Sequence, residues 1–115
     1  MLHTNLKHIM TADEHAKFIQ ENENVMICCG RMGPMCIPVY GIMEDLEKEY
    51  SHVKFCDMEF DSPESRVIRN SPECRGFMGL PFTAYYRNGK LVKATTSVQN
   101  EHQVRTILNA EFKKN

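Results

Sequence analysis

The chain has 115 residues, 42% of them hydrophobic and 25% charged, and its formal net charge is −1. This composition is ordinary for a soluble globular protein, and the length suits one domain over residues 1–115. Lysine and arginine form no cluster, which argues against nucleic acid as a partner. The longest strictly apolar run, residues 25–29, is too short to span a membrane, and no apolar leader segment opens the chain. We therefore expect a cytoplasmic protein.

Strand-like and helix-like segments alternate along the chain. Strands are expected at residues 6–10, 25–29, 52–60, 82–86 and 90–96, and helices at 11–21, 36–50, 61–68 and 100–112. The run at 25–29 is continuously apolar, as in a strand that is covered on both faces. The early strand–helix–strand unit implies parallel central strands, and the last two strands form a hairpin. We predict an α/β fold with the order βαβαβαββα, a central mixed sheet and helices on both faces.

Short local signals support these boundaries. Thr11 and Glu14 have the spacing of a capping box, and an Asn-x-x-Gln sequence at 100–103 opens the last helix. Asn88-Gly89 is typical of the tight turn of a hairpin. In the second helix, apolar residues recur at spacings of three and four, which predicts an inward stripe. Its members are Cys36, Val39, Tyr40, Met43, Leu46 and Tyr50.

The sequence "CCGRMGPMC", residues 28–36, holds three of the five cysteines. An odd number of cysteines in a small chain argues against a secreted disulfide scaffold and leaves redox chemistry, metal binding or simple packing open. The spacing is not that of a zinc site, and no histidine neighbours the loop. We expect no metal site. Cys28 and Cys56 are predicted to be core residues, and Cys74 is predicted to be more exposed.

The order of elements, together with "GFMGLPFTAYYRNGK" at 76–90, resembles the thioredoxin family. Gly79-Leu80-Pro81, the Asn-Gly turn and "GPMC" before the second helix carry the resemblance, which covers nearly the whole chain. It implies a thioredoxin fold, a cis Leu80–Pro81 peptide bond and an extended peptide bound along Leu80 and Pro81. It also implies protein or low-molecular-weight disulfide substrates, electrons from a thioredoxin-reductase-type partner, and no bound cofactor.

Two departures from the family pattern concern the usual active-site residues. The family has Cys-x-x-Cys at the start of the second helix, and the alignment that places Cys36 at the second cysteine places Gly33 at the first. The chain has no tryptophan, and the buried acid of the family falls near Ile27. The family's activity therefore does not transfer on its usual residues.

A different cysteine pair is predicted, Cys29 with Cys36. In such a fold the end of the second strand lies beside the first turn of the next helix, and strand alternation is expected to send Cys28 to the opposite face. Gly33 as N-cap and Pro34 in the first turn would place Cys36 at a helix N-terminus, which favours a thiolate. Cys29 is expected to attack first and Cys36 to resolve the mixed disulfide.

These inferences predict a thiol–disulfide oxidoreductase that serves electron transfer and redox homeostasis through Cys29 and Cys36. Leu80, Pro81, Gly33 and Pro34 are the predicted substrate-binding residues. The alternative is a thioredoxin-fold binding module without turnover, which uses the same loop and proline to hold an extended peptide.

Overall fold

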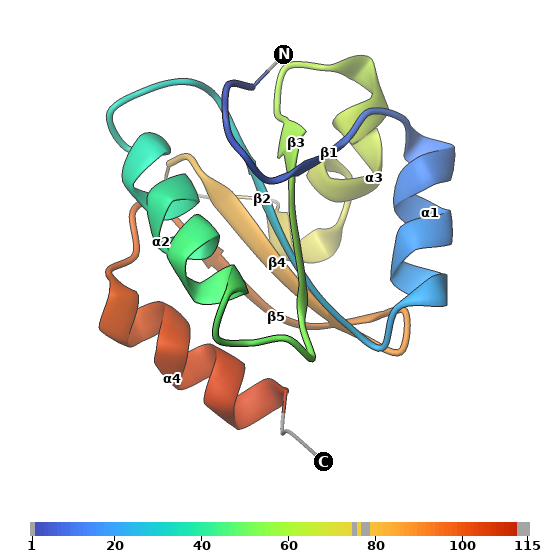
Figure 1. The fold of residues 1–115 in the computed structure, drawn as a ribbon. Coiled ribbons are helices and arrows are strands. Elements are labelled where there is room, and N and C mark those ends of the chain that lie inside the picture. The colour runs from blue at the N-terminus through green and yellow to red at the C-terminus, as the bar shows by residue number, and fades with distance from the viewer. Residues whose placement is uncertain (1, 75, 77–78, 113–115) are drawn as a thin grey trace.

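The computed structural model describes residues 2–74, 76 and 79–112, and its centre is one five-stranded sheet in the order β1-β3-β2-β4-β5 (Figure 1). The strands are β1 Lys7–Ile9, β2 Asn24–Gly30, β3 Lys54–Glu59, β4 Phe82–Arg87 and β5 Lys90–Thr96. β3 is parallel to β1 and β2, and β4 is antiparallel to β2 and β5. The predicted mixed sheet is confirmed, with β2 at its centre.

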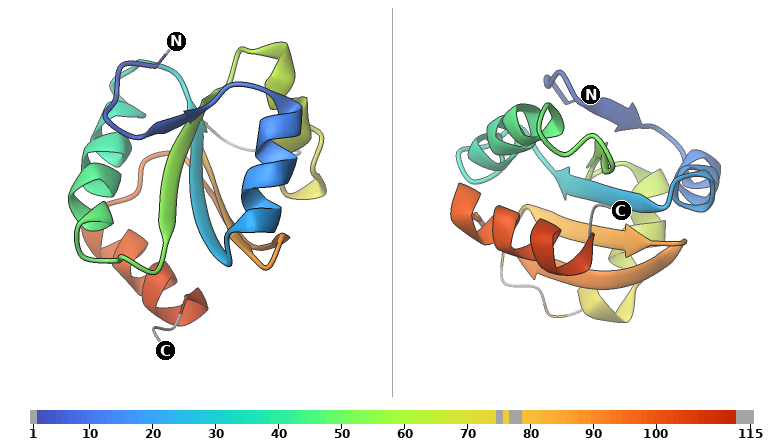
Figure 2. Two further views of the ribbon diagram at one scale, coloured as in Figure 1. Left: turned by 45° about the vertical axis from the view of Figure 1, so that its right-hand side comes forward. Right: turned by 60° about the horizontal axis from the view of Figure 1, so that its bottom comes forward.

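Helices cover both faces of this sheet, as predicted (Figure 2). They are α1 Ala12–Glu21, α2 Ile37–Glu47, α3 Arg66–Arg69 and α4 Glu101–Glu111, with 3-10 turns η1 Pro63–Ser65 and η2 Pro72–Cys74. α2 and α4 pack on one face, here called the α2/α4 face, and α1 and α3 pack on the other, the α1/α3 face. The helix expected at 61–68 is a 3-10 turn that leads into a single α-helical turn.

Each face has its own hydrophobic core. The core of the α2/α4 face is built from buried residues of α2, α4, the strands and the segments that flank them: Leu2, Leu6, Met26, Cys28, Cys36, Val39, Tyr40, Met43, Leu46, Val53, Phe55, Tyr85, Val104, Leu108 and Phe112. The core of the α1/α3 face contains Ile9, Ile19, Val25, Ile27, Cys29, Cys56, Met58, Ile68, Cys74, Phe82, Ala84 and Tyr86. The predicted inward stripe of the second helix is confirmed from Cys36 to Leu46.

The local signals act as the sequence indicates, with one difference. Asn88 and Gly89 have positive φ values of 53° and 80°, as a tight hairpin turn requires. Asn100 caps α4 with a complete capping box. At α1 the Thr11 hydroxyl accepts from the Glu14 N–H at 3.0 Å, but the Glu14 carboxylate accepts from the Met10 N–H at 2.7 Å, one residue before the cap.

Two features are absent from the part of the chain that the structure describes. None of its helices has the length and apolar character needed to cross a membrane. Nor do three or more His, Cys, Asp or Glu side chains among these residues form a group that could hold a metal ion.

Candidate functional site

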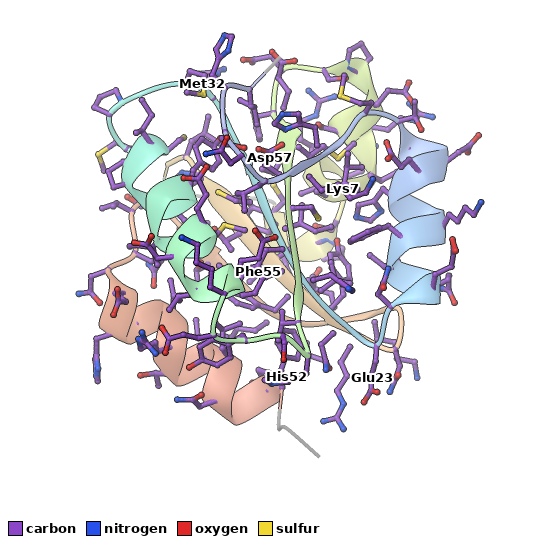
Figure 3. All side chains as sticks on the ribbon, viewed as in Figure 1. Lys7, Glu23, Met32, His52, Phe55 and Asp57 are labelled. Atoms are coloured by element: carbon purple, nitrogen blue, oxygen red, sulfur yellow. The ribbon has the colours of Figure 1, made fainter. Side chains whose placement is uncertain are left out.

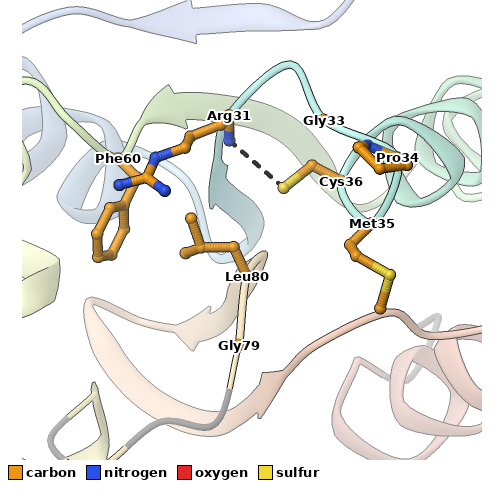
Figure 4. A pocket seen from close by; sticks show the side chains of 8 residues that line it. All are labelled: Arg31, Gly33, Pro34, Met35, Cys36, Phe60, Gly79 and Leu80. Carbon is orange, nitrogen blue, oxygen red and sulfur yellow. Dashed lines mark hydrogen bonds between the residues drawn. The ribbon is translucent and has the colours of Figure 1, made fainter.

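An open groove of about 380 Å³ lies between the loop after β2 and the segment before β4 (Figure 4). Its lining residues are Arg31, Gly33, Pro34, Met35, Cys36, Phe60, Gly79 and Leu80. Three of the four residues predicted to bind substrate therefore line one groove. Cys36 is the cysteine that lines it, and Cys29 does not.

The fourth predicted residue, Pro81, lies beside the thiol. The Leu80–Pro81 peptide bond is cis, which confirms the prediction. A Cβ placed on Gly30 would stand 3.2 Å from Pro81 Cβ and 2.8 Å from both Cys36 Sγ and Tyr40 Oη. Real Cβ atoms do not approach heavy atoms so closely, so the last residue of β2 must lack a side chain. The space that a side chain would fill holds the thiol, the phenol and the proline ring.

Cys36 is the N-cap of α2, with φ −90° and ψ −40°. Gly33 was expected in that role, and the expectation is wrong because an additional turn precedes the helix. In this turn the Gly33 carbonyl accepts from the N–H groups of Cys36 and Ile37, at 3.1 and 3.0 Å. Pro38 occupies the first helical turn, where its missing N–H costs nothing. The Arg31 N–H donates to Cys36 Sγ at 3.4 Å, as Figure 4 shows.

The adjacent cysteines of β2 face opposite sides of the sheet, but not the sides predicted. Cys28 lies in the core of the α2/α4 face together with Cys36, and Cys29 lies in the core of the α1/α3 face. The expectation that Cys28 points away from Cys36 is therefore wrong. β2 continues one residue further than predicted, to Gly30, and its even-numbered positions face α2. All five cysteines are buried free thiols, and the pairing of Cys29 with Cys36 stays a prediction. The expectation that Cys74 is more exposed is wrong, because η2 packs it into the core of the α1/α3 face.

Burial in the two cores determines the direction in which the pKa values of Cys28 and Cys29 shift. Burial raises the pKa of Cys28 well above its usual range; the Thr83 hydroxyl opposes this, and among neighbouring charges a thiolate at Cys36 would raise it most. Burial also raises the pKa of Cys29 to about 12. A hydrogen bond from Ser65 opposes this rise, and a thiolate at Cys74 would add to it. Burial therefore keeps both thiols protonated at neutral pH.

A buried carboxyl group belongs to Asp57 on β3, which Figure 3 labels. In the sheet register Asp57 lies beside Cys28. Asp57 is 1% exposed; it accepts from the Thr4 hydroxyl and pairs with His8 Nδ1 at 2.7 Å. Burial raises the pKa of its carboxyl group, and the two hydrogen-bond partners oppose the rise. Asp57 has no predicted role. The available signal was an acid inside the apolar run "FCDM", since such residues are rarely buried without partners.

Comparison with known proteins identifies the fold. No protein-family model and no curated protein matches the sequence. Among solved structures, mitochondrial thioredoxin 3 of Saccharomyces cerevisiae is similar with a TM-score of 0.75 and 20% identity, over 91% of this chain and 94% of that one. Fasciola hepatica thioredoxin has a TM-score of 0.76 and 19% identity, over 91% of this chain and 98% of that one.

Thioredoxin f2 of Chlamydomonas reinhardtii is similar over an even larger part of the molecule. The match covers 96% of this chain and all of that chain, with a TM-score of 0.75 and 15% identity. At such identities the likeness concerns the backbone arrangement. The chain has a thioredoxin fold.

Proposed function

We propose that the chain is a thiol–disulfide oxidoreductase that acts on protein or low-molecular-weight disulfides bound in the groove, with Cys36 as its groove thiol. The observation that carries the proposal is the position of this thiol. Cys36 lines the groove beside cis-Pro81, at the N-terminus of an 11-residue helix. A helix N-terminus stabilises the negative charge that a thiol develops when it attacks a disulfide.

The chemistry needs two protein thiols. Cys36 attacks one sulfur of the substrate disulfide; that S–S bond breaks, one substrate thiol leaves, and a mixed disulfide joins Cys36 to the substrate. The second protein thiol then attacks Cys36 Sγ, loses its proton, and releases the second substrate thiol. Two protein thiols become one disulfide, and the substrate disulfide becomes two thiols. A thioredoxin-reductase-type partner in the cytoplasm would return the two electrons.

Two cysteines are candidates for the second thiol. Cys28 shares the core of the α2/α4 face with Cys36, whereas Cys29 lies in the core of the α1/α3 face. The shared face favours Cys28 over the predicted Cys29. This arrangement also reverses the predicted roles, because the groove thiol Cys36 would attack first.

A binding module without turnover is the second candidate function. It is favoured by two observations at the groove: Gly33 stands where a first cysteine would be, and Cys36 is only 2% exposed. Apolar side chains beside the groove are exposed, with Met35 at 46% and Ile37 at 48%. In this function an extended peptide would add along Leu80 in the manner of an edge strand.

Insulin reduction with a dithiol as electron source separates the two functions. We expect the wild type to accelerate the reaction and Cys36→Ser to fall to the rate of the dithiol alone. In a separate incubation of the reduced protein with insulin and no dithiol, Cys28→Ser should accumulate a mixed disulfide between Cys36 and substrate, because the resolving thiol is missing. Cys74→Ser is the matched control, since its thiol lies on the α1/α3 face, and it should keep the wild-type rate.

Three results would change the proposal. Full activity of Cys36→Ser would contradict it. An active Cys28→Ser together with an inactive Cys29→Ser would restore the predicted Cys29–Cys36 pair. A wild type without turnover that binds a reduced peptide, and loses this binding when Leu80 is replaced by Asp, would establish the binding module.

A further inference from the structure

The hydrogen bond to the Cys36 sulfur does not come from the helix that Cys36 caps. The side chain of an N-cap residue ordinarily accepts from the second or third N–H of its helix, but the second residue of α2 is Pro38, which has no N–H. The Val39 N–H donates to the Cys36 carbonyl at 3.0 Å. The Ile37 N–H donates to the Gly33 carbonyl, also at 3.0 Å. Within the described part of the chain, no N–H of the first helical turn donates to Cys36 Sγ.

The donor is the backbone N–H of Arg31, the first residue after β2, whose nitrogen lies 3.4 Å from Cys36 Sγ (Figure 4). Hydrogen bonds to an ionised group are stronger than those to a neutral one, so this N–H favours the thiolate over the thiol. The peptide group that carries the N–H is also held at its other end, because the Gly30 carbonyl accepts from the Phe60 N–H at 2.9 Å. The stability of a thiolate at Cys36 therefore depends on the position of the Arg31 backbone.

Tyr40 of α2 holds the Arg31 backbone from the interior of the protein. Its hydroxyl donates to the Arg31 carbonyl at 3.1 Å, and the residue is 2% exposed. Tyr40 follows Cys36 by four residues, so the two side chains lie on the same side of α2. Cys36 Sγ and Tyr40 Oη each lie 2.8 Å from the point where a Cβ on Gly30 would stand. One side of α2 thus contacts both backbone groups of Arg31, the N–H through the sulfur and the carbonyl through the phenol.

A further anchor of Arg31 is its guanidinium group, which lies on the surface. Two of its nitrogen atoms donate to the Asp61 carboxylate at 2.8 Å each, and both side chains are more than half exposed. Exposed ion pairs of this kind contribute little and are screened by salt. The buried hydrogen bond from Tyr40 is therefore the firmer of the two anchors.

The Tyr40 hydroxyl keeps its proton when the thiols around it ionise. Burial is the main cause that raises the pKa of Tyr40, and negative charges on Cys28, Cys36, Asp57 and Cys29 would raise it further. The phenol therefore remains a donor to the Arg31 carbonyl whether Cys36 is a thiol or a thiolate.

We propose that Tyr40 is a positioning residue for the Cys36 thiol, whose hydroxyl holds the Arg31 carbonyl and thereby keeps the Arg31 N–H on the sulfur. Without the hydroxyl, Arg31 keeps only its exposed ion pair and moves away from Cys36 Sγ. The thiolate then loses its hydrogen bond and forms only at higher pH. The proposal rests on the proposed function in one respect, that Cys36 is the reacting thiol, and it needs neither a second thiol nor turnover.

Tyr40→Phe tests this role, because it removes the hydroxyl and keeps the ring that packs in the core. The ultraviolet absorbance of the thiolate is followed in the folded protein as the pH is raised. Subtracting the curve of the same protein with Cys36→Ser leaves the signal of Cys36 alone, and no reagent has to reach the buried sulfur. We expect the midpoint in Tyr40→Phe to lie about one pH unit above that of the wild type, as the loss of a hydrogen bond to a charged group predicts.

Two control variants separate positioning from stability and from charge. Tyr50→Phe also removes a tyrosine hydrogen bond, the one that its hydroxyl donates to Asn109 Oδ1 at 2.9 Å, and it should leave the midpoint unchanged. Arg31→Ala removes the guanidinium and keeps the N–H and the carbonyl. Any rise of the midpoint in Arg31→Ala should disappear in concentrated salt, whereas the rise in Tyr40→Phe should persist.

A second measurement needs no variant. In the wild type, the NMR signal of the Arg31 amide proton should move downfield as Cys36 ionises, with the same midpoint as the absorbance, because this proton lies on the sulfur. In Tyr40→Phe the movement should be smaller.

The proposal is overturned if Tyr40→Phe and the wild type have the same midpoint, or if Tyr50→Phe raises the midpoint equally. It is equally overturned if the rise in Tyr40→Phe disappears in salt, or if the Arg31 amide proton does not respond to the ionisation of Cys36. A wild type that does not reduce insulin, together with a raised midpoint in Tyr40→Phe, would refute only the proposed function.

Discussion

The two faces of the sheet are built differently, although both bury cysteines from the same strand. The α2/α4 face is covered by two helices of 11 residues each, and its groove holds a thiol at a helix N-terminus. The α1/α3 face is covered by the 10-residue α1 and by a 4-residue α3 between 3-10 turns. Short helices gain little from their own hydrogen bonds, so the second cover depends on its buried side chains. We therefore expect the helices that cover Cys29 to open more easily than those that cover Cys28.

Ile68→Ala should have the largest effect, because it removes the apolar anchor of α3. A buried isoleucine truncated to alanine costs about 2–5 kcal/mol of unfolding free energy. Because α3 and its flanking 3-10 turns are short, the loss of this anchor should let them open more often. We therefore also expect faster alkylation of Cys29 and Cys74 in the native protein, with that of Cys28 unchanged. Urea unfolding measures the first effect, and mass-spectrometric labelling rates with N-ethylmaleimide measure the second.

Leu46→Ala is the matched change on the opposite face, since Leu46 of α2 is also fully buried. It should lower stability over a similar range without accelerating the alkylation of Cys74. Equal acceleration at Cys74 in both variants would show that the thiols become accessible only by global unfolding, and that the two covers do not differ.

Gly30→Ala tests the tight packing of the α2/α4 face. The new methyl group would stand 2.8 Å from Cys36 Sγ and Tyr40 Oη, so these groups must shift. Such overpacking costs about 1–3 kcal/mol, and insulin reduction should fall with it because the groove thiol moves. Gly41→Ala in α2 is the control, because nothing lies within 4 Å of its added methyl group. It should stabilise the protein by about 0.5–1 kcal/mol.

The smallest effect concerns His15, whose ring lies against Tyr86 near the α1/α3 core and is 5% exposed. Burial lowers the pKa of His15 below its ordinary 6.5. The unfolded chain then binds a proton more readily than the folded one, so stability is fully present above pH 6.5 and declines as the pH falls below it. His15→Gln should reduce the loss in urea midpoint between about pH 7.5 and about pH 5.

His102→Gln, which removes an exposed imidazole from α4, is the control for the loss of one histidine. An identical acid-induced loss in the wild type and in His15→Gln would mean that His15 does not contribute to the pH dependence.

Much of the fold was predictable because its signals are local. The order of elements, the hairpin at Asn88-Gly89 and the cap of α4 each depend on a few neighbouring residues. The cis bond before Pro81 was predicted from the resemblance to the thioredoxin family, through the short motif Gly79-Leu80-Pro81 just before a strand. Leu80 belongs to this motif, and Gly33 and Pro34 belong to a second one, the "GPMC" before α2; all three line the groove.

The orientation of the cysteines was not predictable from β2 itself. Every residue of this strand from Asn24 to Gly30 is buried, so apolar and polar residues do not alternate along it. The sequence of the strand therefore does not show which residues face which side of the sheet. The last residue of the strand is a glycine, which adds no side chain to mark the inward face. Tertiary contacts determine which side each residue faces, above all the close approach of Cys36 and Tyr40 to Gly30.

The adjacent cysteines of β2 have one more consequence. A trivalent arsenical holds two sulfurs at once and therefore needs both on the same side of the backbone. In the native strand the two sulfurs lie in cores on opposite sides of a hydrogen-bonded sheet, so neither rotation nor side-chain movement brings them together. Only when β2 has left the sheet does the Cys28-Cys29 sequence become a vicinal dithiol. Binding of a trivalent arsenical to both sulfurs therefore reports that the central strand has unfolded.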